Sequence, residues 1–157
     1  MNKQTLTVAM EILRPVGIGV VIFSAYYYGH DAVTRFHYLG PSVVLLMCGT
    51  VAFEGLFLGD VAAAKIGYAP NRAYQIQSAL ANAALALTAG LVYVLGWGRH
   101  AEAAIVTAML VFFTLSAGNH AYTALRGGNL KPVNLLRPVL ALLLLAFLVP
   151  NMVLALR

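Results

Sequence analysis

The chain has 157 residues, of which 61% are hydrophobic and only 10% are charged. Soluble domains carry about 25% charged residues, and the shortage runs along the whole chain, so we expect one integral membrane domain and no separate soluble domain. The net charge of +5 does not indicate nucleic-acid binding, because the Lys and Arg residues sit at the ends of apolar segments and form no stripe.

Five apolar segments follow one another, and each is predicted to form a transmembrane helix. The last four approach the roughly 20 residues that a spanning helix needs, whereas the first relies on a polar N-terminal extension. The predicted helices cover residues about 5–29, 39–60, 76–97, 103–125 and 133–156. The predicted fold is therefore an all-α polytopic membrane helix bundle in a single domain, with the lipid bilayer as its surroundings.

The distribution of Lys and Arg predicts the orientation of this bundle. With the N-terminus inside, the inner segments hold seven of these residues and the outer segments hold three. Positive residues accumulate on the cytoplasmic side, so we expect the N-terminus in, the C-terminus out, and a location in a bacterial inner (cytoplasmic) membrane. The inner set is Lys3, Arg14, Lys65, Arg72, Arg126, Lys131 and Arg137, and the outer set is Arg35, Arg99 and Arg157.

The segment Tyr38–Asp60 carries an acid, Glu54, inside a predicted crossing. A carboxylate there costs about 2.5 kcal/mol or more, so it normally faces protein or a water-filled cavity and has a partner. The same segment has Gly55 and Gly59 at GxxxG spacing, which lets two helices approach closely. We expect this face to make a contact within the chain, and a dimer contact is the alternative.

Small residues are concentrated in the second, third and fourth predicted helices, and they mark contact faces in lipid. These three helices should therefore form the tight centre of the bundle. The fifth helix is mostly Leu, which suits lipid or a partner subunit. Cys48, the only cysteine, is expected to be a small buried hydrophobe.

Six polar side chains are predicted to gather in the inner half of the membrane, whereas the outer halves of helices two to five contain almost nothing polar beyond Thr and Ser. This asymmetry suggests a pocket or half-channel that opens inward, with a carboxylate as acid or base and an imidazole as its titratable partner. The alternative is a hydrogen-bonded network that only holds the helices together. The six residues are Glu54, Gln77, Asn82, Asn119, His120 and Arg137.

The individual residues also have plainer interpretations. Asn82 is better read as interhelical hydrogen bonding, His120 could equally be an interfacial histidine, and Arg137 would snorkel to the surface or neutralise the acid. No metal site is expected, because no helix has HxxxH or ExxH spacing and three histidines are predicted loop residues on the opposite side. Those histidines are His30, His37 and His100. No cofactor is indicated.

Two local patterns lie in the N-terminal part of the chain. Glu11 and Arg14 are three residues apart, which places them on one face of the first helix. The tetrad Leu-Arg-Pro-Val occurs at residues 13–16 and again at 136–139, each time near the start of an outward-going helix. Because nothing downstream repeats, we attribute the second pattern to chance in a Leu- and Val-rich chain, ahead of an internal duplication.

Several short motifs resemble those of small bacterial multi-helix integral membrane proteins of unknown function. The resemblance spans about Phe53 to Leu148 and implies a shared bundle in which Glu54, Asn82 and His120 matter, without implying an activity. The five-helix tryptophan-rich sensory proteins have a similar size, but Trp97 is the only tryptophan here. The motifs are Phe53-Glu54-Gly55-Leu56-Phe57-Leu58, Ala64-Lys65-Ile66-Gly67-Tyr68, Gln75 to Gly90, and Ala117-Gly118-Asn119-His120.

Three functions fit these observations. The first is a small transporter or ligand-binding membrane protein, expected to be a homo-oligomer, with Glu54 as its charged centre. The second is an accessory subunit of a larger membrane complex, in which the Leu-rich helix docks and the polar residues are structural. The third, an enzyme acting on a lipid or quinone, would use Glu54 and His120 as acid and base, and we rank it last.

Overall fold

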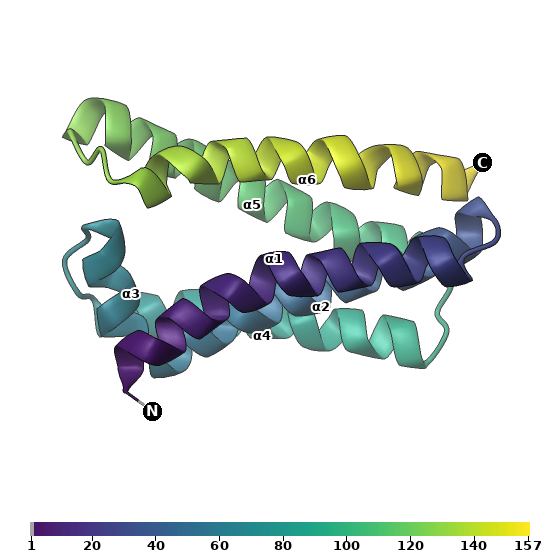
Figure 1. Cartoon of the computed structure of the whole chain (residues 1–157), viewed down its shortest axis with the longest axis horizontal. Coiled ribbons are helices and arrows are strands. Elements are labelled where there is room, and N and C mark those ends of the chain that lie inside the picture. The colour runs from purple at the N-terminus through teal and green to yellow at the C-terminus, as the bar shows by residue number, and fades with distance from the viewer. Residues whose placement is uncertain (1) are drawn as a thin grey trace.

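The computed structural model describes residues 2–157, and this part of the chain is all-α (Figure 1). Five of its helices, all but the short α3, are long and apolar enough to cross a membrane, as the sequence predicted. The N- and C-termini lie at opposite ends of the bundle. The helices are α1 (Lys3–Tyr28), α2 (Ala32–Phe57), α3 (Gly59–Ile66), α4 (Arg72–Val94), α5 (Arg99–Gly127) and α6 (Pro132–Leu156).

The helices begin earlier than the apolar segments do. Asp31 caps α2, since its carboxylate accepts a hydrogen bond of 2.8 Å from the backbone N–H of Thr34. The helix therefore starts seven residues before position 39 and includes His37, so the predicted loop over residues 30–37 is wrong. His100 likewise lies in the first turn of α5. A polar first turn extends these helices beyond the stretch that hydropathy detects, and in α1, α2 and α4 a side-chain cap holds it.

The predicted second helix is interrupted near its end. Leu58 leaves the helical conformation (φ −123°, ψ 12°), so α2 stops at Phe57 and the separate helix α3 follows. Arg72 satisfies the carbonyls exposed by this break, because its guanidinium donates to the backbone oxygens of Gly55 and Leu56 at 2.9 and 2.5 Å. A cation at a helix C-terminus also complements the helix dipole.

Helix α2 is the centre of the bundle and contacts each of the other five helices. The apolar spans of α2, α5 and α4 have the largest buried shares, in that order, whereas α6 is less buried and α1 is almost entirely on the surface. This order confirms the expectation drawn from the small residues. Large apolar side chains of α1 and α6 consequently point outward, including Phe23, Leu140, Leu142 and Leu143.

The GxxxG face makes a contact within the chain, as expected. A Cβ atom added to Gly55 would lie 2.7 Å from the Cβ of Ala79, and one added to Gly59 would lie 2.3 Å from Oε1 of Gln75. Both neighbours belong to α4, so Gly55 permits the close approach of α2 to α4, and Gly59, the first residue of α3, permits that of α3.

The hydrophobic core occupies the half of the bundle away from α3. It includes the thiol of Cys48, which is buried as predicted. Side chains near the C-terminus of α2 and the N-terminus of α6 take no part in it, so the α3 half is free for polar contacts. Its largest fully buried side chains include Phe36, Leu39, Val43, Val44, Met109 and Leu148.

Candidate functional site

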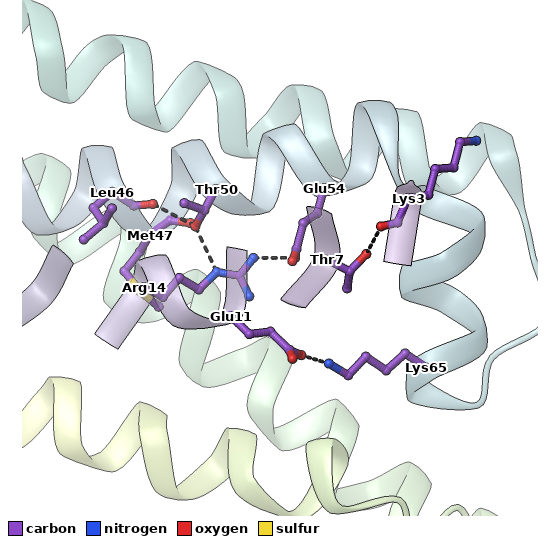
Figure 2. Close-up of polar contacts among 9 residues, drawn as sticks. All are labelled: Lys3, Thr7, Glu11, Arg14, Leu46, Met47, Thr50, Glu54 and Lys65. Carbon is purple, nitrogen blue, oxygen red and sulfur yellow. Dashed lines mark hydrogen bonds and ion pairs between the residues drawn. The ribbon is translucent and has the colours of Figure 1, made fainter. Parts of the chain in front are cut away.

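Glu54 has a partner in the bundle, and that partner is Arg14 of α1 (Figure 2). The Arg14 guanidinium donates through Nη2 to the Glu54 carboxylate and through Nε to the hydroxyl oxygen of Thr50, the latter at 2.9 Å. Thr50 can accept this bond because its own hydroxyl donates to the backbone oxygen of Leu46. The side chains of Arg14 and Glu54 are 23% and 14% exposed. The ion pair therefore fixes α1 against α2 in a largely desolvated position.

A second ion pair joins α1 to α3. Glu11, one turn before Arg14, binds the ammonium group of Lys65, as Figure 2 shows. This pair is more open to solvent, with side-chain exposures of 41% for Glu11 and 34% for Lys65. Glu11 and Arg14 do share a helix face, as predicted, but they bind different helices instead of each other.

His120 is held by a network that defines which of its ring nitrogens carries hydrogen. The amide nitrogen of Asn134 donates to the backbone oxygens of Ile66 and Asn129 at 3.0 and 3.3 Å. The amide oxygen of Asn134 therefore faces the imidazole, where it accepts from Nδ1–H at 3.0 Å. The other nitrogen, Nε2, accepts from the Arg137 guanidinium. Because Nε2 accepts a hydrogen bond in this arrangement, it carries no hydrogen. The imidazole is therefore neutral, since both ring nitrogens carry hydrogen in the protonated form.

Tyr68 covers one face of His120. The two rings stack with their centroids 5.5 Å apart and an interplanar angle of 13°, and the tyrosine hydroxyl lies 3.2 Å from Nδ1. Gly67 makes this placement feasible, since it ends α3 in the left-handed conformation (φ 77°). A Cβ there would also lie 2.9 Å from the side chain of Asn129. The loop after α3 thus carries an aromatic ring onto the α5–α6 pair.

These contacts form one group of side chains, which we call the polar cluster. Arg137 lies within electrostatic range of both Arg14 and Glu54, so the α1–α2 ion pair and the α5–α6 network lie near each other, although among the described residues no hydrogen bond joins them. Within residues 2–157, no carboxylate lies at ion-pair distance from Arg137. The polar cluster therefore holds two guanidinium groups and one carboxylate, and that carboxylate is paired with Arg14. The polar cluster consists of Arg14, Glu54, Tyr68, His120, Asn134 and Arg137.

The other predicted site residues lie elsewhere. Asn82 is fully buried on α4, donates to the backbone oxygen of Ser78 at 2.9 Å, and has no partner in the described chain for its Oδ1. Gln77 and Asn119 are exposed. Their depth matches that of the cluster, but successive helix residues point about 100° apart, so Asn119 projects away when His120 projects inward.

Sequence reasoning missed Arg14, Tyr68 and Asn134. The repeated tetrad was the available signal for the first, since the second residue of each copy is an arginine of the polar cluster, Arg14 in α1 and Arg137 in α6. Tyr68 and Asn134 gave no signal, because a tyrosine and an asparagine near a helix end are common at a membrane boundary.

The opposite end of the bundle carries a buried charged pair that the sequence did not predict. Oε1 of Glu102 lies 2.5 Å from Nδ1 of His37, and Glu102 is only 2% exposed. The expectation that this half is nearly free of polar groups is therefore wrong. The error followed from treating His37 as a loop residue. No cluster of three or more His, Cys, Asp or Glu side chains suited to a metal ion occurs in the described part of the chain.

The fold and the polar cluster thus define an all-helical protein with five helices suited to a membrane. The chain belongs to DUF6790, described as a family of unknown function, whose model matches residues 27–157. This match reaches further toward the N-terminus than the predicted resemblance did, and it contains every residue of the polar cluster except Arg14. No curated protein matches the chain, and neither does any solved structure.

Proposed function

We propose that the chain is an integral protein of a bacterial inner membrane, with five spanning helices, its N-terminus inside and its C-terminus outside. The exposed apolar faces of α1 and α6 support insertion, because lipid would cover them. The charge distribution supports the orientation. Seven of the ten Lys and Arg residues belong to the half with α3 and the N-terminus, and three to the other.

We infer that the inner end binds a small ligand that carries an anionic group, and that the protein transports this ligand across the membrane. The observation behind this proposal is Arg137, a half-buried cation whose hydrogen-bond acceptor is a neutral imidazole and not a carboxylate. A guanidinium in such a place binds a carboxylate or phosphate with two parallel hydrogen bonds. On arrival of the ligand, Arg137 would exchange Nε2 of His120 for the anion.

Glu54 has a different role in this proposal from that of a free acid or base. Its carboxylate is engaged by Arg14, so it neutralises one of the two arginines and leaves the other for the ligand. The pairing keeps the net charge of the polar cluster at one positive unit, which one ligand anion would balance.

A subunit role in a membrane complex, or in a homo-oligomer, is the second candidate. It is favoured by the fact that Arg14, Glu54 and Thr50 satisfy one another without a ligand. The Leu-rich outer face of α6 would then contact a partner chain. Under this proposal the polar cluster stabilises the bundle and binds nothing.

Thermal denaturation of the purified protein in maltoside detergent distinguishes the two candidates. Acetate, succinate and inorganic phosphate are the probes, each at constant ionic strength, and a ligand at 100 times its Kd stabilises by about 2.7 kcal/mol. Binding at the polar cluster predicts a clearly smaller stabilisation of Arg137→Gln than of the wild type and of Arg126→Gln, an exposed arginine at the same end.

An equal response of Arg137→Gln would show that the anion does not bind this residue. A subunit instead predicts that no part of the response depends on Arg137, together with a fixed partner that copurifies from membranes and is retained when Glu54 is changed to Gln.

A further inference from the structure

A pocket opens at the end of the bundle opposite the polar cluster. It has a volume of about 250 Å³ and lies between the first turns of α2 and α5 and the turn that joins α4 to α5. Three of its lining side chains are ionisable, namely His37, Arg99 and Glu102. None of them belongs to the polar cluster, so this pocket is unexplained by the proposed function.

His37 is held rigidly at the wall of the pocket. Its Nδ1 bonds Glu102 at 2.5 Å, and its ring stacks on Tyr93 with the centroids 4.6 Å apart and an interplanar angle of 12°. The carboxylate makes Nδ1 the donor, which leaves Nε2 with no hydrogen-bond partner within residues 2–157. The carboxylate thus fixes the orientation of the ring and leaves Nε2 as the ring atom that a ligand can contact.

The charges in the pocket favour an anion. Glu102 is 2% exposed and is compensated by His37, so the pair is neutral overall when the imidazole holds its second proton. Arg99 donates through Nη1 to the backbone oxygen of Ala155 at 3.1 Å, and no carboxylate of the described chain lies at ion-pair distance from it. When His37 is protonated, one positive charge, that of Arg99, is therefore left over in the lining of the pocket.

We propose that this pocket binds a small oxyanion, a carboxylate or a phosphate, through the Arg99 guanidinium and Nε2–H of His37. Thr34 also lines the pocket, but its hydroxyl donates to Asp31 and is not needed. The guanidinium supplies the planar pair of donors that suits an oxyanion, and the imidazolium supplies a third. This inference uses no residue of the polar cluster, so it can fail or hold independently of the proposed function.

The oxyanion has two sources at this position. Because the pocket lies where α5 begins and α4 ends, a phospholipid headgroup could reach it as well as a free anion. The chemistry of recognition is the same in both cases. A comparison of two media distinguishes the two sources, because maltoside detergents contain no phosphate whereas phospholipids do.

The test is a titration of the full-length protein with inorganic phosphate, followed by the side-chain ¹⁵N resonances of His37. In maltoside we expect a saturable change at Nε2 of His37 in the wild type. Arg99→Gln should weaken the binding at least tenfold, whereas Arg157→Gln, an exposed arginine at the same end, should leave it unchanged. Arg99→Lys keeps the charge but loses the planar fork and should be intermediate.

The same titration in phospholipid nanodiscs identifies the source. Binding that persists there indicates a free anion, and binding that disappears indicates that a headgroup phosphate already fills the pocket. The proposal is overturned if His37 does not respond to phosphate in maltoside, or if Arg99→Gln binds as the wild type does. Should Arg99→Gln not fold, Arg99→Lys and the wild-type response of His37 decide the question.

Discussion

Replacing Glu54 by Gln tests whether the ion pair with Arg14 holds α1 onto the bundle. The amide keeps the size of the carboxylate and can still accept one hydrogen bond, but it removes the negative charge. Arg14 would then remain in the same place, bound to Thr50 at 2.9 Å and without a counter-ion. We expect the folded bundle to lose stability.

The exposures of the two side chains determine the size of this loss. Breaking a fully buried ion pair from one side costs about 3–5 kcal/mol, whereas neutral interhelical hydrogen bonds in membranes average about 0.6 kcal/mol. Arg14 and Glu54 are 23% and 14% exposed, so water reaches part of the guanidinium left behind. We therefore expect about 2 kcal/mol, between the two limits.

The measurement is the free energy of unfolding in mixed micelles, arranged as a double-mutant cycle of Arg14→Gln and Glu54→Gln. The double variant should recover much of the stability, because it leaves no unpaired charge. Glu11→Gln is the matched control, since its pair with Lys65 is 34–41% exposed and should contribute at most about 1 kcal/mol. The reasoning is refuted if the two single changes are additive, or if Glu54→Gln costs no more than Glu11→Gln.

Three further outcomes follow from the structure. Gly55→Ala should lower the free energy of unfolding by about 1–3 kcal/mol, because the added Cβ would lie 2.7 Å from that of Ala79 and disturb the contact of α2 with α4. Gly118→Ala, whose added Cβ meets nothing within 4 Å, should have no such effect in the same assay. The backbone N–H of Thr34 lowers the pKa of Asp31 from its usual 3.8, so the capping stabilisation is complete above that pH and is lost as the pH falls through the lowered value. Loss of protection of the Thr34 amide below that pH, measured relative to its intrinsic exchange rate, would verify the sign, and in Asp31→Ala this protection should be absent at all pH values. A phosphatase fused to the C-terminus should be active in intact cells and a green fluorescent protein fused there should be dark, and the reverse result would contradict the orientation.

The main features of the fold could be predicted because each of the five long helices coincides with an extended apolar segment. The helix ends could not be predicted equally well, because they depend on single capping residues. Asp31 and Asn71 each accept a hydrogen bond from the N–H three residues later, and this adds a polar turn that hydropathy assigns to a loop. The break at Leu58 was also hidden, since both sides of it are apolar.

Part of the polar cluster could be predicted from depth alone. Glu54 and His120 lie at similar heights on two helices that run in the same direction, Arg137 lies at that height on a helix that runs opposite to them, and the structure places all three in one region. Depth says nothing about the direction around each helix axis, which is why Gln77 and Asn119 were included although they are exposed. The partners depended on which helices are neighbours, and the sequence does not give that information.

Helices α2 and α5 each contribute one histidine and one glutamate to the polar contacts at the two ends of the bundle, in opposite order along the chain. Along α2 a histidine precedes a glutamate, His37 and then Glu54, about 25 Å apart along the axis. Along α5 the glutamate Glu102 comes first and His120 follows, at nearly the same spacing. At the end away from α3, the histidine of α2 and the glutamate of α5 bond each other directly.

At the α3 end the corresponding glutamate and histidine each bind an arginine instead, one from each copy of the repeated tetrad. A carboxylate and an imidazole alone can neutralise each other by sharing a proton. Adding two guanidinium groups removes that solution, because the carboxylate can compensate only one of them and the imidazole must stay neutral to accept from the other. The arginines of the two tetrads thereby give the α3 end a net positive charge, which the glutamate–histidine pair alone would not have. For this reason an anionic ligand suits the α3 end better than a proton relay through Glu54.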